Sequence, residues 1–253
     1  MSPFTIRLKF HGDLPFFLRS KTRRETVERV LWEKASVKDV IESCGVPHPE
    51  VDLILVDCQP IDFHYTFRAD GDVDIYPVGL LPTYFPKNRL QVSNSMEFVA
   101  DGHLGKLARD LRLLGFDTAY DRDADDRQLL ATMKESNRAL LTRDRRLLMH
   151  AIVQHGYYLR SQNPINQTIE VLRRFDLFSA IAPFTRCLRC NAPLQKVKKT
   201  DVIQKLEPLT KIYYEQFRRC MGCGQIYWAG SHFSKLQKRL EEIHAQFRGA
   251  EPD

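Results

Sequence analysis

Four cysteines have the residue type and the spacing that bind a metal ion. Two residues separate Cys187 from Cys190 and Cys220 from Cys223, and 29 residues lie between the two pairs. Thiolates in two such pairs complete a tetrahedral zinc site and leave no coordination position open for catalysis. The residue after each pair, an asparagine or a glycine, tolerates the left-handed backbone that curls around a metal-bound sulfur. The spacing therefore predicts a zinc ribbon with structural Zn²⁺.

The alternative for these cysteines is a pair of disulfides, which needs an oxidising compartment. The N-terminal residues contain no apolar run of the kind found in signal peptides, so we expect a cytoplasmic protein with reduced thiols. No stretch reaches the roughly 20 apolar residues of a membrane span, and no membrane contact is expected. Cys44 and Cys58 stand apart from the cluster in apolar surroundings, which predicts buried free thiols.

Aspartates follow several short apolar segments that read as strands. Asp101 comes directly after residues 98–100, Asp144 lies two residues past 139–142, and an acidic run occupies residues 121–126. Parallel strands would bring these carboxylates to one edge of a sheet, where Mg²⁺ or Mn²⁺ would offset their repulsion. Such ions can orient water for attack on a phosphodiester. The alternative is that strand-end aspartates form turns and cap helices.

The C-terminal part of the chain carries all of the excess positive charge. Residues 183–253 contain 13 Lys and Arg against 7 Asp and Glu, whereas residues 1–182 contain 25 of each. Basic residues alternate there with aromatic ones, a composition that suits RNA or DNA. The candidates for substrate contact in this part are Lys196, Lys198, Lys199, Arg218 and Arg219. The alternative is a solvated hairpin whose aromatic side chains form a small core.

Three further arginines lie close in sequence to the candidate acids and suit phosphate through paired hydrogen bonds: Arg109, Arg112 and Arg143. Their alternative role is pairing with neighbouring aspartates at the surface.

The acids must be positioned by strands that alternate with helices. Residues 98–100, 116–120, 139–142 and 157–161 have strand patterns, and helical patterns with an apolar face fall between them. Asp126 is expected to cap the second helix, and Gly156 to end the third. This alternation predicts an α/β fold with a parallel sheet, whose sites lie beyond the C-terminal ends of its strands.

The first part of the chain has a different order of elements. Short apolar strands surround one helix over residues 36–44, which Ser36 caps and Gly45 ends. Over residues 4–78 this order resembles the α+β ubiquitin-like β-grasp fold, in particular the sulfur-carrier proteins. Those carriers end in an exposed Gly-Gly, whereas Val78-Gly79 continues into more chain. Carrier chemistry is therefore not expected, and a docking or scaffolding role, with a protein partner, is expected instead.

Motifs in the rest of the chain resemble one family. They are FVADGHLGKLAR at residues 98–109, LRLLGFDT at 111–118, Asp125-Asp126, LTRDR at 141–145 and YWAGSH at 227–232. In this order they are similar to the Mut-seven C-terminal ribonuclease family of PIN-like nucleases, which often carries a ubiquitin-like domain in front. The resemblance implies a PIN-like sheet, a zinc ribbon and a metal-dependent RNase site. Its catalytic residues would be Asp101, Asp125, Asp126 and Asp144, with Asp101, Asp126 and Asp144 as ligands of Mg²⁺ or Mn²⁺.

These observations predict a β-grasp domain at 1–82, a linker at 83–96, a PIN-like nuclease domain at 97–182, a zinc ribbon at 183–235 and a C-terminal helix and tail at 236–253. The expected function is hydrolysis of RNA phosphodiester bonds, in structured RNA such as tRNA. A non-catalytic RNA-binding adaptor is the alternative. An aspartyl phosphotransferase is a third class, but the position two residues after Asp101, where such enzymes usually carry a second Asp, is His103.

Overall fold

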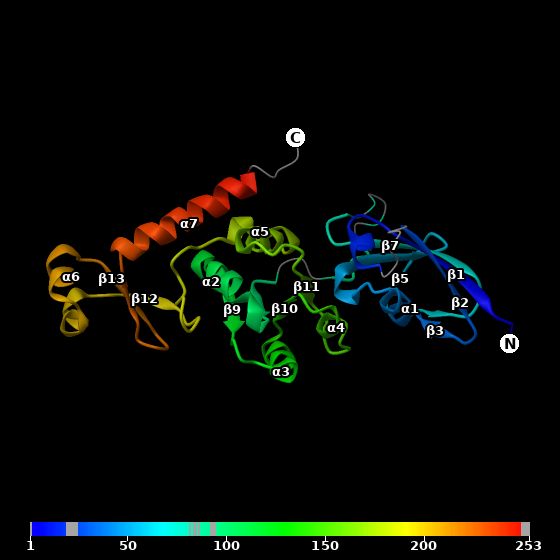
Figure 1. The fold of residues 1–253 in the computed structure, drawn as a ribbon, viewed down its shortest axis with the longest axis horizontal. Coiled ribbons are helices and arrows are strands. Elements are labelled where there is room, and N and C mark those ends of the chain that lie inside the picture. The colour runs from blue at the N-terminus through cyan, green and yellow to red at the C-terminus, as the bar shows by residue number, and fades with distance from the viewer. Residues whose placement is uncertain are drawn as a thin grey trace. The chain divides into compact units, whose positions relative to one another are not determined.

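A computed structural model describes residues 2–18, 25–80, 82, 85, 87–91 and 95–248 (Figure 1). The chain divides into two compact units, one formed by residues 1–93 with 139–158 and the other by 94–138 with 159–253. Residues 83, 84, 86 and 92–94 of the linker expected at 83–96, and residues 249–253 at the end of the tail, lie outside the described residues. No helix among the described residues is long and apolar enough to cross a membrane.

The N-terminal part has the topology of a β-grasp. Its five-stranded sheet has the order β2-β1-β7-β4-β5, with β1 parallel to β7 and antiparallel to β2. Alternate side chains of β1 point into a core that also takes up the apolar face of the helix, because strand residues alternate between faces. Ser36 caps that helix, as predicted, by accepting a hydrogen bond from the Asp39 amide at 3.1 Å. The elements are β1 (Phe4–Phe10), η1 (Leu14–Phe17), β2 (Thr26–Leu31), β3 (Ala35–Ser36), α1 (Val37–Ser43), η2 (His48–Glu50), β4 (Val51–Val56), β5 (Gln59–Ile61), β6 (Thr66–Phe67) and β7 (Gly71–Pro77).

The middle of the chain forms the predicted α/β sheet. Four strands have the order β11-β10-β8-β9, and β8 with β9 and β10 with β11 are parallel pairs. Helices connect the strands, so the strand ends lead directly into helix starts. The elements are β8 (Glu97–Ala100), η3 (Gly102–Leu104), α2 (Gly105–Leu114), β9 (Asp117–Tyr120), α3 (Asp126–Ser136), β10 (Ala139–Thr142), α4 (Arg145–Leu148), β11 (Gly156–Tyr158), α5 (Pro164–Arg174) and η4 (Phe178–Ala180).

The C-terminal part contains a small antiparallel sheet and the longest helix. The sheet has the order β12-β13-β14, and a helical insertion between β12 and β13 covers one face of it. The helix α7 packs on α5, with Ile243 fully buried, and Figure 1 shows the two helices side by side. The elements are β12 (Leu194–Val197), η5 (Lys199–Asp201), η6 (Ile203–Lys205), α6 (Pro208–Tyr213), β13 (Phe217–Cys220), β14 (Ile226–Trp228) and α7 (Ser231–Arg248).

Several local expectations need correction. Cys58 is exposed rather than buried, because it lies in the tight turn between β4 and β5, with a φ of 64°. Gly156 begins β11 instead of ending a helix, and the cap of α3 is Asp125, one residue before the predicted Asp126. The last helix starts at Ser231, five residues before the expected boundary at 236.

Candidate functional site

The four cysteines come together as the spacing predicted. Their Sγ atoms all lie within 4.8 Å of one another. Among the described residues, this is the one place where three or more Cys, His, Asp or Glu side chains come close enough to share a metal ion. Cys187 and Cys223 are 3.7 Å apart at sulfur, and Cys190 and Cys220 are 3.3 Å apart. A disulfide would need about 2.0 Å, whereas tetrahedral zinc with bonds of about 2.3 Å needs sulfur separations of about 3.8 Å. The donor set therefore fits a structural metal ion such as Zn²⁺.

The backbone around the cysteines is arranged for bound thiolates. Asn191 and Gly224 adopt the left-handed conformation with φ of 71° and 72°, as predicted. Amides of the second knuckle point at Cys220 Sγ, with Gly222 N and Cys223 N each at 3.4 Å. Such amides stabilise negative sulfur.

Tyr227, the first residue of the motif at 227–232, belongs to the cysteine site. Its Oη lies 3.1 Å from Cys187 Sγ and accepts a hydrogen bond from the Leu188 amide at 3.2 Å. Burial and the adjacent Cys187 sulfur raise the pKa of Tyr227, so the hydroxyl keeps its proton and can donate it to a thiolate. Groups of this kind orient and tune metal ligands. Strand alternation could have indicated this role, because Tyr227 pairs with Arg218, two residues before Cys220 on β13.

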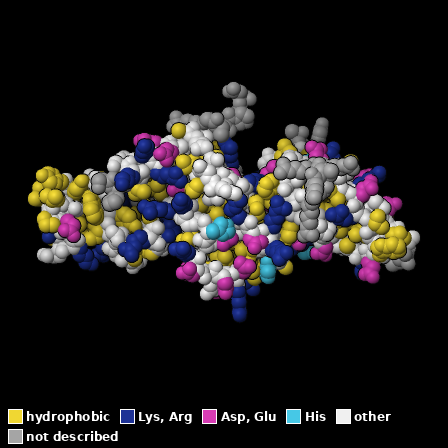
Figure 2. Space-filling view, in the orientation of Figure 1, with side chains coloured by type: hydrophobic (Ala, Val, Ile, Leu, Met, Phe, Trp, Pro, Cys, Tyr) yellow, Lys and Arg dark blue, Asp and Glu magenta, His cyan; other side chains and the backbone are white. Residues whose placement is uncertain are grey.

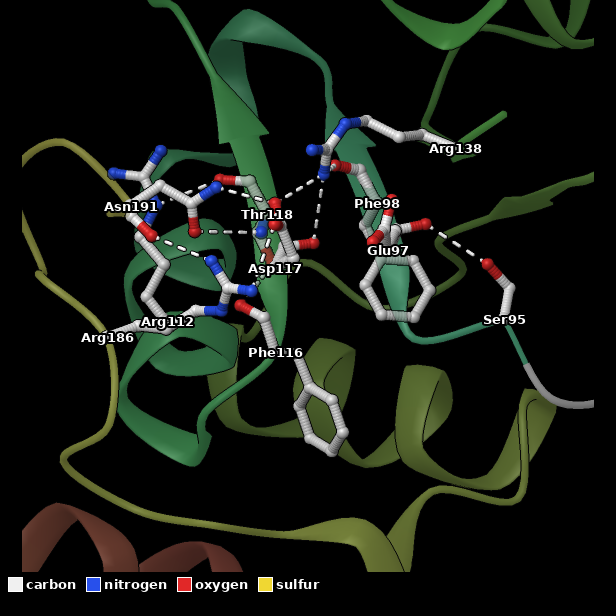
Figure 3. A network of polar contacts seen from close by, with 10 residues as sticks. All are labelled: Ser95, Glu97, Phe98, Arg112, Phe116, Asp117, Thr118, Arg138, Arg186 and Asn191. Carbon is white, nitrogen blue, oxygen red and sulfur yellow. Dashed lines mark hydrogen bonds and ion pairs between the residues drawn. The ribbon is translucent and has the colours of Figure 1, made fainter. Parts of the chain in front are cut away.

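A network of polar contacts joins the first cysteine knuckle to the start of β9 (Figure 3). The Asn191 side chain donates to Asp117 Oδ1 at 2.7 Å and accepts from the Thr118 amide at 3.0 Å. Asp117 also pairs with Arg138 and, at 3.0 Å, with Arg186. Burial alone would raise the pKa of Asp117, but the donors Arg138 and Asn191 and the charges of both arginines lower it below its usual value. The network was not predicted, since its members are distant in sequence.

Arg112 is part of the same contact and does not face solvent. Only 5% of the residue is exposed, and its guanidinium donates to the carbonyls of Thr118, Leu188 and Arg189 at 2.9, 3.3 and 3.1 Å. Burial lowers the pKa of Arg112. The prediction that Arg112 contacts phosphate is therefore wrong, because its donors are already used to hold the knuckle. Arg109, one turn earlier on α2, is exposed.

Asp101 lies at the end of β8, beside the loop that follows β9. Its side chain is 17% exposed, and its Oδ1 is 3.3 Å from Nδ1 of the half-exposed His103. The Tyr120 hydroxyl donates to the Gly102 carbonyl at 2.8 Å. A Cβ on Gly102 would lie 2.5 Å from the Arg122 carbonyl oxygen, so glycine permits this close approach. The loop after β8 thus packs on the start of the acidic run.

The other predicted acids begin helices. Asp125 forms a capping box with Gln128, in which each side chain bonds the other residue's amide, at 2.8 and 2.9 Å. Asp126 is the first residue of α3 and is exposed. Asp144 caps α4 by accepting from the amides of Arg146 and Leu147 at 2.7 and 3.3 Å. Helix capping, the alternative role considered for these acids, thus applies to Asp125 and Asp144. Among the described residues, none of the four aspartates joins a group of three close metal ligands.

The predicted basic residues of the ribbon differ in their surroundings. Lys196 and Lys198 are exposed, whereas Lys199 pairs with Glu215 and Arg218 donates to the Phe184 carbonyl at 2.9 Å. Lys196 lies directly opposite Arg218 in the β12–β13 pair, and Gln195 lies opposite Arg219. Figure 2 shows Lys and Arg side chains gathered around β12 and α7. Arg143, the remaining predicted phosphate contact, follows the last residue of β10 in sequence and is half-buried.

Comparison with known families assigns the part of the chain that holds the cysteines and Asp101. The family described as Mut7-C RNAse domain matches residues 96–240, which is more than half of the chain. The chain belongs to this family. The family described as Mut7-C ubiquitin matches residues 4–80, in agreement with the β-grasp topology. No curated protein and no solved structure matches the chain.

Membership in the Mut7-C RNAse family agrees with the architecture described above. The parallel strands, the ribbon sheet and the cysteine cluster all fall within the matched range, and the ubiquitin-like domain precedes it. The family description associates this part of the chain with RNA and with nuclease chemistry.

Proposed function

We propose that this protein is a metal-dependent ribonuclease that hydrolyses phosphodiester bonds in structured RNA such as tRNA. The observation that carries the proposal is the Mut7-C RNAse match over residues 96–240, which includes Asp101 at the end of a parallel strand. Sites in parallel α/β sheets lie at this end of the strands.

Asp101, Asp126 and Asp144 are proposed as ligands of Mg²⁺ or Mn²⁺, with Asp125 as the alternative to Asp126. Carboxylate oxygens are the donors that these hard cations prefer. Asp126 is exposed at the start of α3, and its carboxylate forms no hydrogen bond to other described residues. Asp101 is held by the packing of Gly102 against the loop after β9. Asp144 is included because it follows β10, and the carboxyl ends of parallel strands lie at one edge of a sheet.

A bound divalent ion would supply an activated water and would offset the charge of the phosphodiester. The protein's own residues would hold and orient the RNA. Arg109 is exposed on α2, the helix that follows Asp101, and with Arg143 it is proposed to contact phosphate. His103 Nδ1 lies 3.3 Å from Asp101 Oδ1 and is proposed to orient that carboxylate oxygen.

The ribbon is proposed to bind structural Zn²⁺ and to hold RNA through Lys196, Lys198, Lys199, Arg218 and Arg219. Like charges directly opposite each other on neighbouring strands destabilise a sheet, and a bound polyanion would remove that cost for Lys196 and Arg218. Thiols kept free for zinc agree with a reducing compartment, and we place the protein in the cytoplasm. The ubiquitin-like domain is proposed to dock a protein partner.

The test is single-turnover cleavage of RNAs that crosslink to the intact protein, with added Mg²⁺ or Mn²⁺. Asp101→Asn and Asp144→Asn should each slow cleavage by at least about 100-fold, since each removes a charge that the cation needs. RNA binding should persist, because a negative charge near the phosphates has been removed. Asp123→Asn, an exposed neighbour outside the proposed ligand set, is the matched control. Cleavage at the wild-type rate by both ligand variants would refute the mechanism.

A non-catalytic RNA-binding adaptor is the second candidate. It is favoured by one observation, namely that Asp125 and Asp144 already serve as helix caps. The adaptor predicts tight RNA binding and no metal-dependent cleavage in the same experiment.

A further inference from the structure

A cavity lies along α2, where the start of α5 and the middle of α7 meet it. Its volume is about 420 Å³, within the range of small-ligand sites. It contains four apolar side chains and three cationic ones, and all of its residues belong to one compact unit. The lining consists of Lys106, Arg109, Asp110, Leu113, Asn163, Pro164, Ile165, Leu236 and Arg239.

The positive charges of the cavity are not equally available. Arg239 from α7 is held by the buried Asp110, to which it donates from Nε at 3.1 and 3.2 Å and from Nη2 at 2.5 Å. Lys106 and Arg109 are exposed and form no ion pair or hydrogen bond with other described residues. Since Asp110 is occupied by Arg239, two cations face the cavity without a matching carboxylate bonded to them.

The N-terminus of α5 does not offer its amides to an anion in the cavity. Asn163 accepts hydrogen bonds from the amides of Ile165 and Asn166 at 2.9 and 3.4 Å, so its side chain already caps the helix. Any anion in the cavity would depend on Lys106 and Arg109. The apolar residues beside them offer a surface for a flat, uncharged group.

We propose that this cavity binds one unpaired nucleotide of the RNA substrate, with its phosphate on Lys106 and Arg109 and its base against Ile165 and Leu236. Proteins hold single-stranded nucleic acid with a basic groove along the backbone and a surface on which the bases lie, usually aromatic and here formed by aliphatic side chains. A base inside a duplex is stacked between its neighbours and could not enter a cavity. The inference deepens the ribonuclease proposal and rests on it for the identity of the ligand.

The location ties the cavity to the proposed site of cleavage. Lys106 is in the first turn of α2, five residues after Asp101, so the chain limits their Cα separation to about 18 Å. A nucleotide in the cavity would therefore lie within a few nucleotides of the cut bond. The C-terminal helix α7 contributes Leu236, which gives that helix a part in substrate choice.

The test measures the affinity of the full chain for a short labelled single-stranded oligoribonucleotide, by fluorescence anisotropy without added divalent metal. Lys106→Ala and Arg109→Ala should each raise the Kd about 5- to 10-fold, as expected for loss of a charge-assisted hydrogen bond. The double variant should lower the slope of log K against log salt by about 0.7, the value for one phosphate contact on a single strand. Lys238→Ala, an exposed cation on α7 outside the cavity, is the control and should lack the position-specific effect described next.

A second series of probes identifies the phosphate. Oligonucleotides that each carry one neutral methylphosphonate linkage should show one position that weakens binding to the wild type and to Lys238→Ala but not to the double variant. Leu236→Ser should weaken binding of the single strand and leave a duplex of the same sequence unaffected. Wild-type Kd and salt slope in the double variant would overturn the proposal, and so would equal effects on the duplex.

The outcomes separate this inference from the proposed function. If the wild type cuts RNA but the cavity variants bind as it does, the cavity proposal fails and the nuclease stands. If the wild type never cuts RNA but shows the position-specific loss, the nuclease fails and the cavity proposal stands.

Discussion

Removing the charge of Asp117 should lower the stability of the unit formed by residues 94–138 and 159–253. Asp117→Asn preserves the shape of the side chain but removes its charge. The remaining carbonyl oxygen can still accept from Arg138 and Asn191, which both donate to Oδ1. The amide nitrogen would replace Oδ2, which pairs with Arg186 at 3.0 Å, and would place a donor against a cation.

The size of the effect follows from burial. The Asp117 and Arg138 side chains are only 17% and 14% exposed, so the ion pair is poorly screened by solvent. Removing one partner of a fully buried pair costs about 3–5 kcal/mol, and the partial exposure here reduces this to about 3 kcal/mol. At about 2–4 °C per kcal/mol, the unfolding temperature should fall by about 6–12 °C.

The assay should report on this unit alone. Trp228 packs in the hydrophobic cluster of the ribbon, and the other tryptophan of the chain is Trp32, which is 68% exposed. In a Trp32→Phe background, urea unfolding followed by Trp228 fluorescence therefore measures the stability of the ribbon region. Asp123→Asn, an exposed acid only six residues away, is the charge-matched control and should change stability by less than about 0.5 kcal/mol.

The dependence on pH gives a second readout with a defined sign. The pKa of Asp117 is lower in the folded protein than its usual value of about 3.9, so the carboxylate favours folding when ionised. The difference between wild type and Asp117→Asn should be complete above about pH 5 and should shrink as the pH falls through the folded pKa. A difference below about 0.5 kcal/mol at pH 7, equal to that of the control, would refute the reasoning.

Four further results are expected. Cys190→Ser should abolish stoichiometric zinc binding and destabilise the ribbon, and unchanged zinc by metal analysis would exclude the site. Gly102→Ala should cost about 1–3 kcal/mol in urea unfolding, because its Cβ meets the Arg122 carbonyl oxygen at 2.5 Å; a neutral result would mean that the loop yields. Asn191→Gly keeps the left-handed turn but removes both side-chain bonds to β9, so it should retain zinc and lose about 1–3 kcal/mol of stability. Asp125→Ala should lower stability by about 1 kcal/mol through loss of the capping box, and no change would show that the cap is dispensable.

Features that depend on neighbouring residues were predictable from the sequence. The left-handed Asn191 and Gly224 follow from the need to curl the chain around sulfur, and Ser36 caps α1 because its hydroxyl can reach the third amide. The cap of α3 was predicted one residue late. The signal for Asp125 was present, since Gln128 stands three residues later as a capping box requires.

Features that depend on distant segments were not predictable in the same way. Arg112 is of the residue type that contacts phosphate. It is buried because a knuckle 76 residues away in sequence supplies carbonyl acceptors for its guanidinium. The cavity on α2 has no sequence signal for a similar reason. Its apolar surface is assembled from α2, α5 and α7, and no local pattern in the sequence marks three segments that meet.

The contacts of the first knuckle give the ribbon a structural role, separate from the RNA binding proposed for it. Asn191 bonds both Asp117 and the Thr118 amide, and Arg112 joins the Thr118 carbonyl to the knuckle carbonyls. Asp117 and Thr118 begin β9, the strand that leads into the acidic run. A metal ion that fixes the knuckle therefore also fixes the strand that leads into these acids. Loss of zinc should thus disorder the acidic loop as well as the ribbon. If both proposed metals bind, this short strand would couple the structural site to the catalytic one, and both lie within residues 96–240 of the family match.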